Sequence, residues 1–133
     1  MQQDEEGFQS TKGNVQIFLN ELKSILNSKN CIFDLLERED KEEKYTNRYC
    51  MNKFDYYKDD VKLELKTLEV SNYYRTVQDE NNKKYKEYYY EFGKIIQGKM
   101  VYIKVKIVSR DNKNILCMSF HFPELEMTRF PYR

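Results

Sequence analysis

The chain has 133 residues, of which 34% are charged and 40% hydrophobic, with a formal net charge of +1 at pH 7. This length fits one domain with an ordinary hydrophobic core. No apolar run approaches the roughly 18 residues of a membrane span. The acidic, polar start of the sequence argues against a secretory signal. The cysteines Cys31, Cys50 and Cys117 are widely spaced, which favours reduced thiols in a cytoplasm. A single histidine argues against a metal site, because such sites need clustered Cys or His ligands.

The small net charge conceals an asymmetry along the chain. From Asn81 onward there are 11 Lys and Arg against 5 Asp and Glu, a difference of +6. This excess favours a phosphate-bearing partner for the second half of the chain. The alternative is that these lysines belong to the solvated faces of strands.

The first third of the chain predicts a tail, a helix and a strand. Residues 1–13 show no periodicity and predict a flexible tail before a single domain over residues 14–133. We expect Asn14 to cap a helix, since the residues after it place apolar side chains on one face: Val15, Phe18, Leu19, Leu22, Ile25 and Leu26. The apolar run from Cys31 to Leu36 fits a short strand. The charged run from Glu37 to Lys44 fits an exposed loop or a fraying helix end.

The middle of the chain predicts one further helix. Asn47 to Phe54 is ambiguous and indicates at most a helical turn, whereas Asp59 to Thr67 has an apolar stripe and acidic residues in its first turn, as a helix prefers. Ser71 is expected to cap a short turn that runs through Arg75. Asp79 to Lys86 is expected to be a polar loop.

Three apolar-rich runs follow, from Tyr88 to Ile96, from Met100 to Ser109 and from Ile115 to Phe122. The breaks at Gln97-Gly98 and at residues 110–114 carry turn chemistry, which predicts an antiparallel meander of three strands. Residues 123–133 predict no regular element. The order of elements indicates an α+β fold, with a small antiparallel sheet of three to four strands and helices packed on one face.

Alternation along the last two strands separates a core face from a polar face. Val101, Ile103, Val105 and Ile107 are expected on the core face, together with Leu116, Met118, Phe120 and Phe122. The opposite face then carries Tyr102, Lys104, Lys106 and His121. A tyrosine, two lysines and the only histidine of the chain would therefore lie together.

Three segments together resemble a known toxin family. The first covers residues 59–75 and ends in Tyr73-Tyr74-Arg75, the second covers residues 92–107 and includes Gly98-Lys99-Met100-Val101-Tyr102-Ile103-Lys104, and the third closes with Ser119-Phe120-His121. In this order and spacing, they resemble the toxins named for the motility quorum-sensing regulator, which belong to the RelE-like mRNA interferases. The resemblance extends over roughly Val15 to Phe122.

This resemblance implies a RelE-like fold and the toxin of a type II toxin–antitoxin system. Such a toxin is a cytoplasmic endoribonuclease that cleaves single-stranded mRNA without metal or cofactor, is held inactive by a cognate antitoxin, and has no membrane or direct DNA partner. By position, the family's lysine after the Tyr-Tyr pair corresponds to Arg75, its middle-strand tyrosine to Tyr102, and its closing lysine to His121. The family's glutamine on the first meander strand has no clean equivalent, the nearest residues being Tyr88 and Tyr89.

Metal-free RNA cleavage needs a proton carrier near neutral pH and fixed cations around the phosphate. His121 is therefore expected to carry the proton, Tyr102 to orient the ribose 2′-OH or to stack on a base, and Arg75 to hold the phosphate. Further RNA contacts are expected from Lys94, Lys104, Lys106 and Tyr88, with the tyrosine stacking on an unpaired base. The alternative is that the tyrosine-rich segment from Tyr85 to Tyr90 covers the sheet edge or docks a partner protein.

Two expectations follow for the structure and for binding. Arg75, Tyr102, Lys104 and His121 should line one concave, solvent-open patch, and RNA binding should weaken as salt rises. The alternative function is a non-catalytic binding module on the same fold, such as a decayed toxin or a regulator that binds a protein partner.

Overall fold

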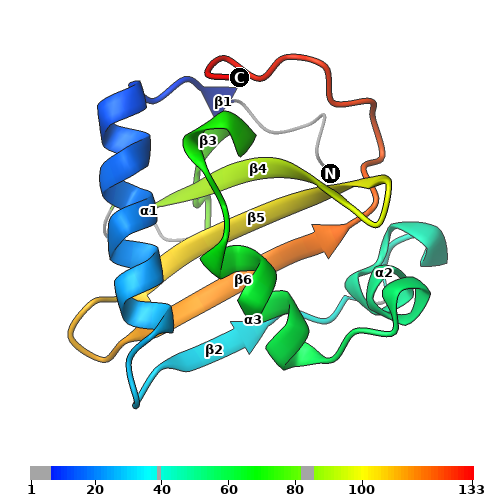
Figure 1. Cartoon of the computed structure of the whole chain (residues 1–133), viewed down its shortest axis with the longest axis horizontal. Coiled ribbons are helices and arrows are strands. Elements are labelled where there is room, and N and C mark those ends of the chain that lie inside the picture. The colour runs from blue at the N-terminus through cyan, green and yellow to red at the C-terminus, as the bar shows by residue number, and fades with distance from the viewer. Residues whose placement is uncertain (1–6, 39, 82–85) are drawn as a thin grey trace.

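A six-stranded mixed sheet forms the centre of the computed structural model, which describes residues 7–38, 40–81 and 86–133 (Figure 1). The strand order is β1-β3-β4-β5-β6-β2, and β2 runs parallel to β6 whereas the other neighbours are antiparallel. The strands are β1 (Gly7–Phe8), β2 (Ile32–Leu35), β3 (Tyr73–Gln78), β4 (Tyr88–Ile96), β5 (Lys99–Ser109) and β6 (Asn114–His121). The α+β class is confirmed, but the expected antiparallel sheet of three to four strands is too small.

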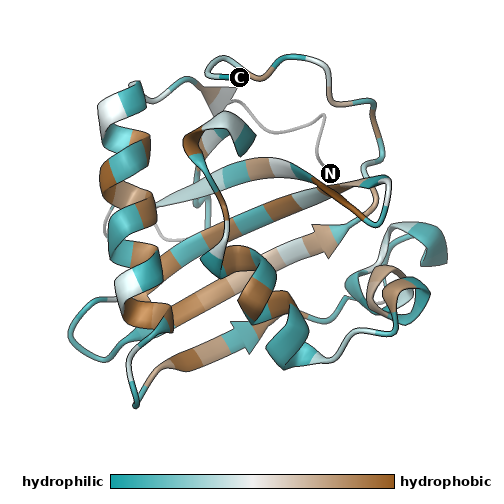
Figure 2. Cartoon of the chain, in the orientation of Figure 1, coloured by the Kyte–Doolittle hydropathy of each residue, from teal (hydrophilic) through white to brown (hydrophobic). Residues whose placement is uncertain are grey.

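Two helices cover one face of this sheet. α1 (Lys12–Leu26) and α3 (Lys58–Lys66) lie in front of the sheet, while α2 (Asn47–Phe54) lies beside the end of β6 (Figure 1). Short 3-10 turns, η2 (Glu43–Tyr45) and η3 (Val70–Asn72), precede α2 and β3. The apolar stripes visible in Figure 2 meet between helices and sheet, where the fully buried core residues include Val15, Leu19, Leu22, Leu65, Phe92, Val101, Ile103, Val105, Ile115 and Phe120.

Differences from the expected elements occur mainly before the meander. Thr11, not Asn14, caps α1, because the Thr11 backbone is extended and its side chain accepts the N–H of Asn14. The part of the expected tail that the structure describes is therefore ordered, with β1 pairing with β3. Residues 1–6 of that tail lie outside the described residues.

The residues expected to form turns or loops contain a helix and a strand. Asn47 to Phe54 is a full helix, which Thr46 caps at its start and Asp55 ends in the left-handed conformation. The turn expected through Arg75 is wrong: η3 ends at Asn72 and β3 begins at Tyr73, where aromatic and β-branched residues favour a strand. In the expected loop from Asp79 to Lys86, residues 82–85 lie outside the described residues.

The three-stranded meander is confirmed. β4 and β5 are joined by Gln97 and Gly98, which both have positive φ angles (49° and 80°). Two consecutive residues with positive φ form the tight hairpin turn whose twist matches that of the flanking strands. No regular element follows β6, as expected for residues 123–133.

A β-bulge in β6 reverses part of the expected alternation. Lys104 pairs with Ser119 and Val105 with Cys117, so Met118 has no partner on β5. As a result Cys117 and Phe120 both belong to the core, whereas Leu116 and Met118, expected there, do not. The bulge keeps Ser119 and His121 on the face opposite the helices.

Asn47 binds the backbone at this bulge and just beyond the end of β2. Its Nδ2 donates to the carbonyl oxygens of Leu36 (2.7 Å) and Met118 (3.2 Å), and its Oδ1 accepts the N–H of Phe120 (2.8 Å). One buried side chain thereby bonds to three backbone groups. Asn47 therefore links the start of α2 to both the end of β2 and the bulge.

Candidate active site

A continuous line of polar side chains crosses the sheet on the face opposite α1 and α3. This polar row consists of Arg75 on β3, Glu91 on β4, Tyr102 on β5 and His121 on β6. Arg75 Nε donates to Glu91 Oε1 at 2.7 Å, and the Tyr102 hydroxyl donates to Glu91 Oε2 at 2.7 Å. The rings of Tyr102 and His121 lie 5.2 Å apart between centroids.

Strand register explains why these four side chains meet. Arg75 pairs with Glu91, and Tyr102 pairs with His121. A shift of register after Tyr73 places that tyrosine with the core residues, whereas Arg75 lies on the other face with Glu91. Bulges in β3 and β6 therefore both help to assemble the row.

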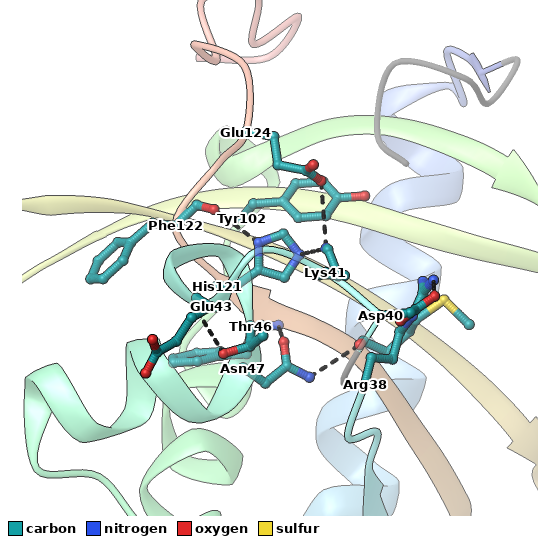
Figure 3. Close-up of polar contacts among 12 residues, drawn as sticks. Arg38, Asp40, Lys41, Glu43, Thr46, Asn47, Tyr102, His121, Phe122 and Glu124 are labelled. Atoms are coloured by element: carbon teal, nitrogen blue, oxygen red, sulfur yellow. Dashed lines mark hydrogen bonds and ion pairs between the residues drawn. The ribbon is translucent and has the colours of Figure 1, made fainter.

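Hydrogen bonds fix the orientation of the His121 ring. Its Nδ1 lies 2.9 Å from the Phe122 carbonyl oxygen, which can only accept, so Nδ1 carries the hydrogen. Its Nε2 then accepts from the Lys41 ammonium at 3.1 Å. Lys41 also lies 3.5 Å from a carboxylate oxygen of Glu124, so that the ammonium sits between the imidazole and this carboxylate (Figure 3).

The polar row is largely closed to solvent. Exposed fractions are 0% for Glu91, 3% for Tyr102 and 2% for His121, whereas Arg75 is partly exposed. The expected solvent-open patch is therefore wrong, although Arg75, Tyr102, Lys104 and His121 do share one face. Alternation along a strand shows which residues share a face, but it does not show what covers that face.

The charged loop after β2 and the chain after β6 provide the cover. Lys41 and Glu124 lie against His121. Gly93 is the partner of Tyr102 on β4, and a Cβ added there would lie 2.7 Å from Phe130. The chain after β6 therefore packs on the face of the polar row.

Comparisons with protein-family models, with curated proteins and with solved structures find no match for this chain. Within residues 7–38, 40–81 and 86–133, no helix has the length and apolar character needed to cross a membrane. In the same ranges no group of three or more His, Cys, Asp or Glu residues could hold a metal ion.

Burial determines the protonation of the site at its His121 end. It lowers the pKa of His121 to about 4, and the neighbouring positive charge of Lys41 acts in the same direction, while the bond to Phe122 opposes both. Burial also lowers the pKa of Lys41, against the opposing effect of Glu124. At neutral pH the imidazole is therefore uncharged and its Nε2 is a proton acceptor.

This lowered pKa predicts a pH-dependent stability. From about pH 6.5 down to about pH 4 the unfolded chain binds a proton that folded His121 does not bind, so the free energy of unfolding should fall by on the order of 3 kcal/mol. Above this range His121 should contribute no pH dependence. Urea unfolding across the range measures the loss.

The matched control is His121→Gln, which cannot titrate but can form both hydrogen bonds. Carboxyl groups titrate in the same range in both proteins, so the difference between the two curves isolates His121. Parallel curves for the two proteins would contradict the assignment of a buried, neutral imidazole.

The other residues expected to bind RNA are distributed over two faces. Lys94 lies on the helix-covered side, where its ammonium is 2.7 Å from a Glu64 carboxylate oxygen and donates to the Glu64 carbonyl. Tyr88 packs edge-on against Phe8 near α1, with 37% of its surface exposed. Neither residue is part of the polar row.

Lys104 and Lys106 do lie on the face of the polar row, but they are buried. Lys106 is ion-paired with Asp79 at 2.7 Å and also with Glu87, and its pKa is raised by these carboxylates although burial opposes the shift. The Lys104 ammonium lies 4.9 Å from the centre of the Tyr89 ring. In this structure both ammonium groups are committed to contacts within the chain.

Two members of the site were missed at the level of sequence. Glu91 is an acidic residue in the middle of an apolar strand, which is a usable signal, and it lies on the strand where the family resemblance calls for a glutamine. Lys41 stands in a run of charged residues that predicts only an exposed loop. Its contact with His121 spans 80 positions, so no local pattern reports it.

Proposed function

We propose that this chain is the toxin of a type II toxin–antitoxin pair and acts in the cytoplasm as a metal-independent, RelE-like endoribonuclease on single-stranded mRNA. The polar row carries this proposal. It joins a guanidinium, a phenol and a neutral imidazole by direct contacts around one buried carboxylate, with an ammonium at its end. These are the groups that cleavage by the ribose 2′-OH requires.

Each group has a distinct task in this reaction. Nε2 of His121 takes the proton of the 2′-OH. Arg75 lies three strands from His121 and against Gly7 of β1, so its guanidinium holds a neighbouring phosphate of the same RNA. The 2′ oxygen then bonds to phosphorus while the bond from phosphorus to the 5′ oxygen breaks. The Lys41 ammonium, whose pKa burial lowers, gives a proton to the departing 5′ oxygen.

Tyr102 and Glu91 support these groups. The Tyr102 hydroxyl can orient the 2′-OH, because its ring lies beside His121. Glu91 is a positioning residue, since its two oxygens hold Arg75 and Tyr102 in place. Its carboxylate occupies the strand on which the toxins that the sequence resembles carry their glutamine.

Access to the polar row requires one local change. Nε2 of His121 and Nζ of Lys41 lie 3.1 Å apart, which leaves no room for a phosphate between them. Lys41 must therefore move away from His121 when RNA binds. A phosphodiester that enters between His121 and Lys41 would have the base and the acid on opposite sides of its phosphorus.

The products of the reaction test the proposal. In the presence of a chelator, the chain should cleave single-stranded RNA to fragments with 2′,3′-cyclic phosphate and 5′-hydroxyl ends. The same oligonucleotide with 2′-deoxyribose at each position should stay intact, because it lacks the nucleophile. Expression of the chain alone should arrest growth, and co-expression of the small protein encoded beside it should relieve the arrest. No cleavage of RNA, or cleavage of the deoxy oligonucleotide, would contradict the mechanism.

The burial of the row favours a second candidate, a non-catalytic binding module. With His121 only 2% exposed and bonded to Lys41, the row can also serve as a stable polar layer beneath a partner-binding surface. A module of this kind would bind its protein partner but would neither cleave RNA nor arrest growth. The growth assay separates the two functions.

A further inference from the structure

A basic, aromatic pocket opens beside the His121 end of the polar row. The α2 pocket has a volume of about 550 Å³ and lies between η2, α2, the start of β5 and the residue after β6. Three lysines and three aromatic residues line it: Lys44, Lys53, Lys99, Tyr45, Tyr49 and Phe122. None of the lining residues is acidic.

The aromatic rings of the α2 pocket are held in place by their neighbours. Phe122 packs edge-on against Tyr49, with 6.2 Å between ring centroids, and against Phe54 at 5.6 Å. Tyr45 and Tyr49 are half-buried, so part of each ring remains accessible. Rings presented in this way can take a flat, apolar group without first losing much conformational freedom.

Ammonium groups lie directly over two of these rings. Lys44 Nζ is 5.2 Å from the centre of the Tyr45 ring, and Lys53 Nζ is 5.2 Å from the centre of the Tyr49 ring. All three lysines of the pocket are exposed, and none forms an ion pair within the described part of the chain. Their positive charge is therefore available to an anion, unlike that of Lys94 or Lys106.

We propose that the α2 pocket binds one unpaired nucleotide of single-stranded RNA. The base stacks on the exposed ring surface of Tyr45 and Tyr49, and the three lysines hold the flanking phosphates. Cations that follow a backbone and rings that stack on any base are the combination used for single-stranded nucleic acids. For its substrate this inference rests on the proposed function.

The position of the pocket links this nucleotide to the reaction. Phe122 directly follows His121 and accepts the hydrogen bond of its Nδ1. Met100, also in the lining, is two residues from Tyr102 on β5. A nucleotide in the α2 pocket would therefore lie next to the one whose phosphate enters the polar row. The pocket would in this way determine which phosphodiester bond of the RNA is cleaved.

Binding can be measured without cleavage by using a fluorescent, 2′-O-methylated single-stranded RNA and anisotropy. The double variant Lys53→Gln/Lys99→Gln should raise Kd by roughly tenfold near physiological salt, and should reduce the slope of log K against log salt by about 1.4, since two phosphate contacts are lost. Tyr49→Ala should raise Kd by about tenfold or more through loss of stacking.

The matched control is Lys12→Gln/Lys29→Gln, which removes the same charge from exposed positions at the two ends of α1. It should leave the affinity close to that of the wild type. Because Lys53 and Lys99 are exposed, their replacement does not endanger folding even if Tyr49→Ala does. If the wild type, the pocket variants and the control bind the RNA with equal affinity, the proposal that the α2 pocket binds a nucleotide is overturned.

Failure of the pocket and failure of the proposed function give different results. If the wild type cleaves RNA but the pocket variants bind it as tightly as the wild type, nucleotide binding by the α2 pocket is contradicted and the proposed endoribonuclease activity is supported. If the pocket variants lose affinity for RNA but the wild type cleaves nothing, nucleotide binding by the α2 pocket is supported and the proposed endoribonuclease activity is contradicted. If only binding to the co-encoded protein weakens, the pocket is a protein-docking site and the inference is overturned.

Discussion

Replacement of His121 by glutamine is expected to lower the rate of RNA cleavage by about 10²–10⁴-fold, the usual contribution of general acid–base catalysis. His121 is uncharged at neutral pH, because burial lowers its pKa to about 4, and its Nε2 can accept the proton of the 2′-OH. A glutamine amide cannot exchange a proton near pH 7. The rate is measured with single-stranded RNA under single-turnover conditions.

The same substitution should leave the fold intact. Glutamine can accept a hydrogen bond from Lys41 and donate one to the Phe122 carbonyl, as His121 does. The melting temperature at pH 8 and the affinity for the antitoxin should therefore stay close to those of the wild type. Lys29→Gln, at an exposed position beyond α1, is the control and should cleave normally. Cleavage by His121→Gln at the wild-type rate would transfer the role of the proton carrier to Tyr102 or a lysine.

Replacement of Asn47 by alanine is expected to lower the free energy of unfolding by about 3 kcal/mol, or roughly 10 °C in melting temperature. Asn47 makes three hydrogen bonds to the backbone of Leu36, Met118 and Phe120 in a buried position. Alanine would leave the Phe120 N–H and two carbonyl groups without these partners. Denaturant unfolding monitored by circular dichroism measures the change.

Asn52→Ala provides the matched control on the same helix. Asn52 is exposed, and its substitution should change the stability by less than about 0.5 kcal/mol. Asn47→Asp should be as destabilising as alanine, since a carboxylate cannot donate to the carbonyls of Leu36 and Met118. A stability of Asn47→Ala within about 0.5 kcal/mol of the wild type would show that the bulge does not depend on this side chain.

The effect of Asn47 should extend to the polar row. Without the bulge at Met118, strict alternation from Cys117 would carry His121 to the helix-covered face. Loss of the Asn47 contacts should therefore weaken the pH dependence that His121 imposes on stability. The candidate site should thus depend on a residue outside the polar row.

The amino-acid sequence by itself determined the elements that local patterns specify. The stripe of α1, the alternation of β5 and the turn at Gln97-Gly98 each depend on residues close in the chain, and all three form as expected. The shared face of Tyr102 and Lys104 also follows from the alternation of β5. His121 lies on the same face because the bulge at Met118 shifts the alternation of β6 by one residue.

Only the tertiary structure decided what joins and covers these elements. β1 and β2 add to the sheet through pairings with β3 and β6, far away in the chain, and so enlarge the expected three to four strands to six. The bulge is hydrogen-bonded to Asn47, 71 positions before Met118, and His121 is in contact with Lys41, 80 positions before it. Periodicity reports which side chains share a face, because it depends on local backbone geometry. Whether that face meets solvent depends on contacts between distant segments, and no local pattern encodes these contacts.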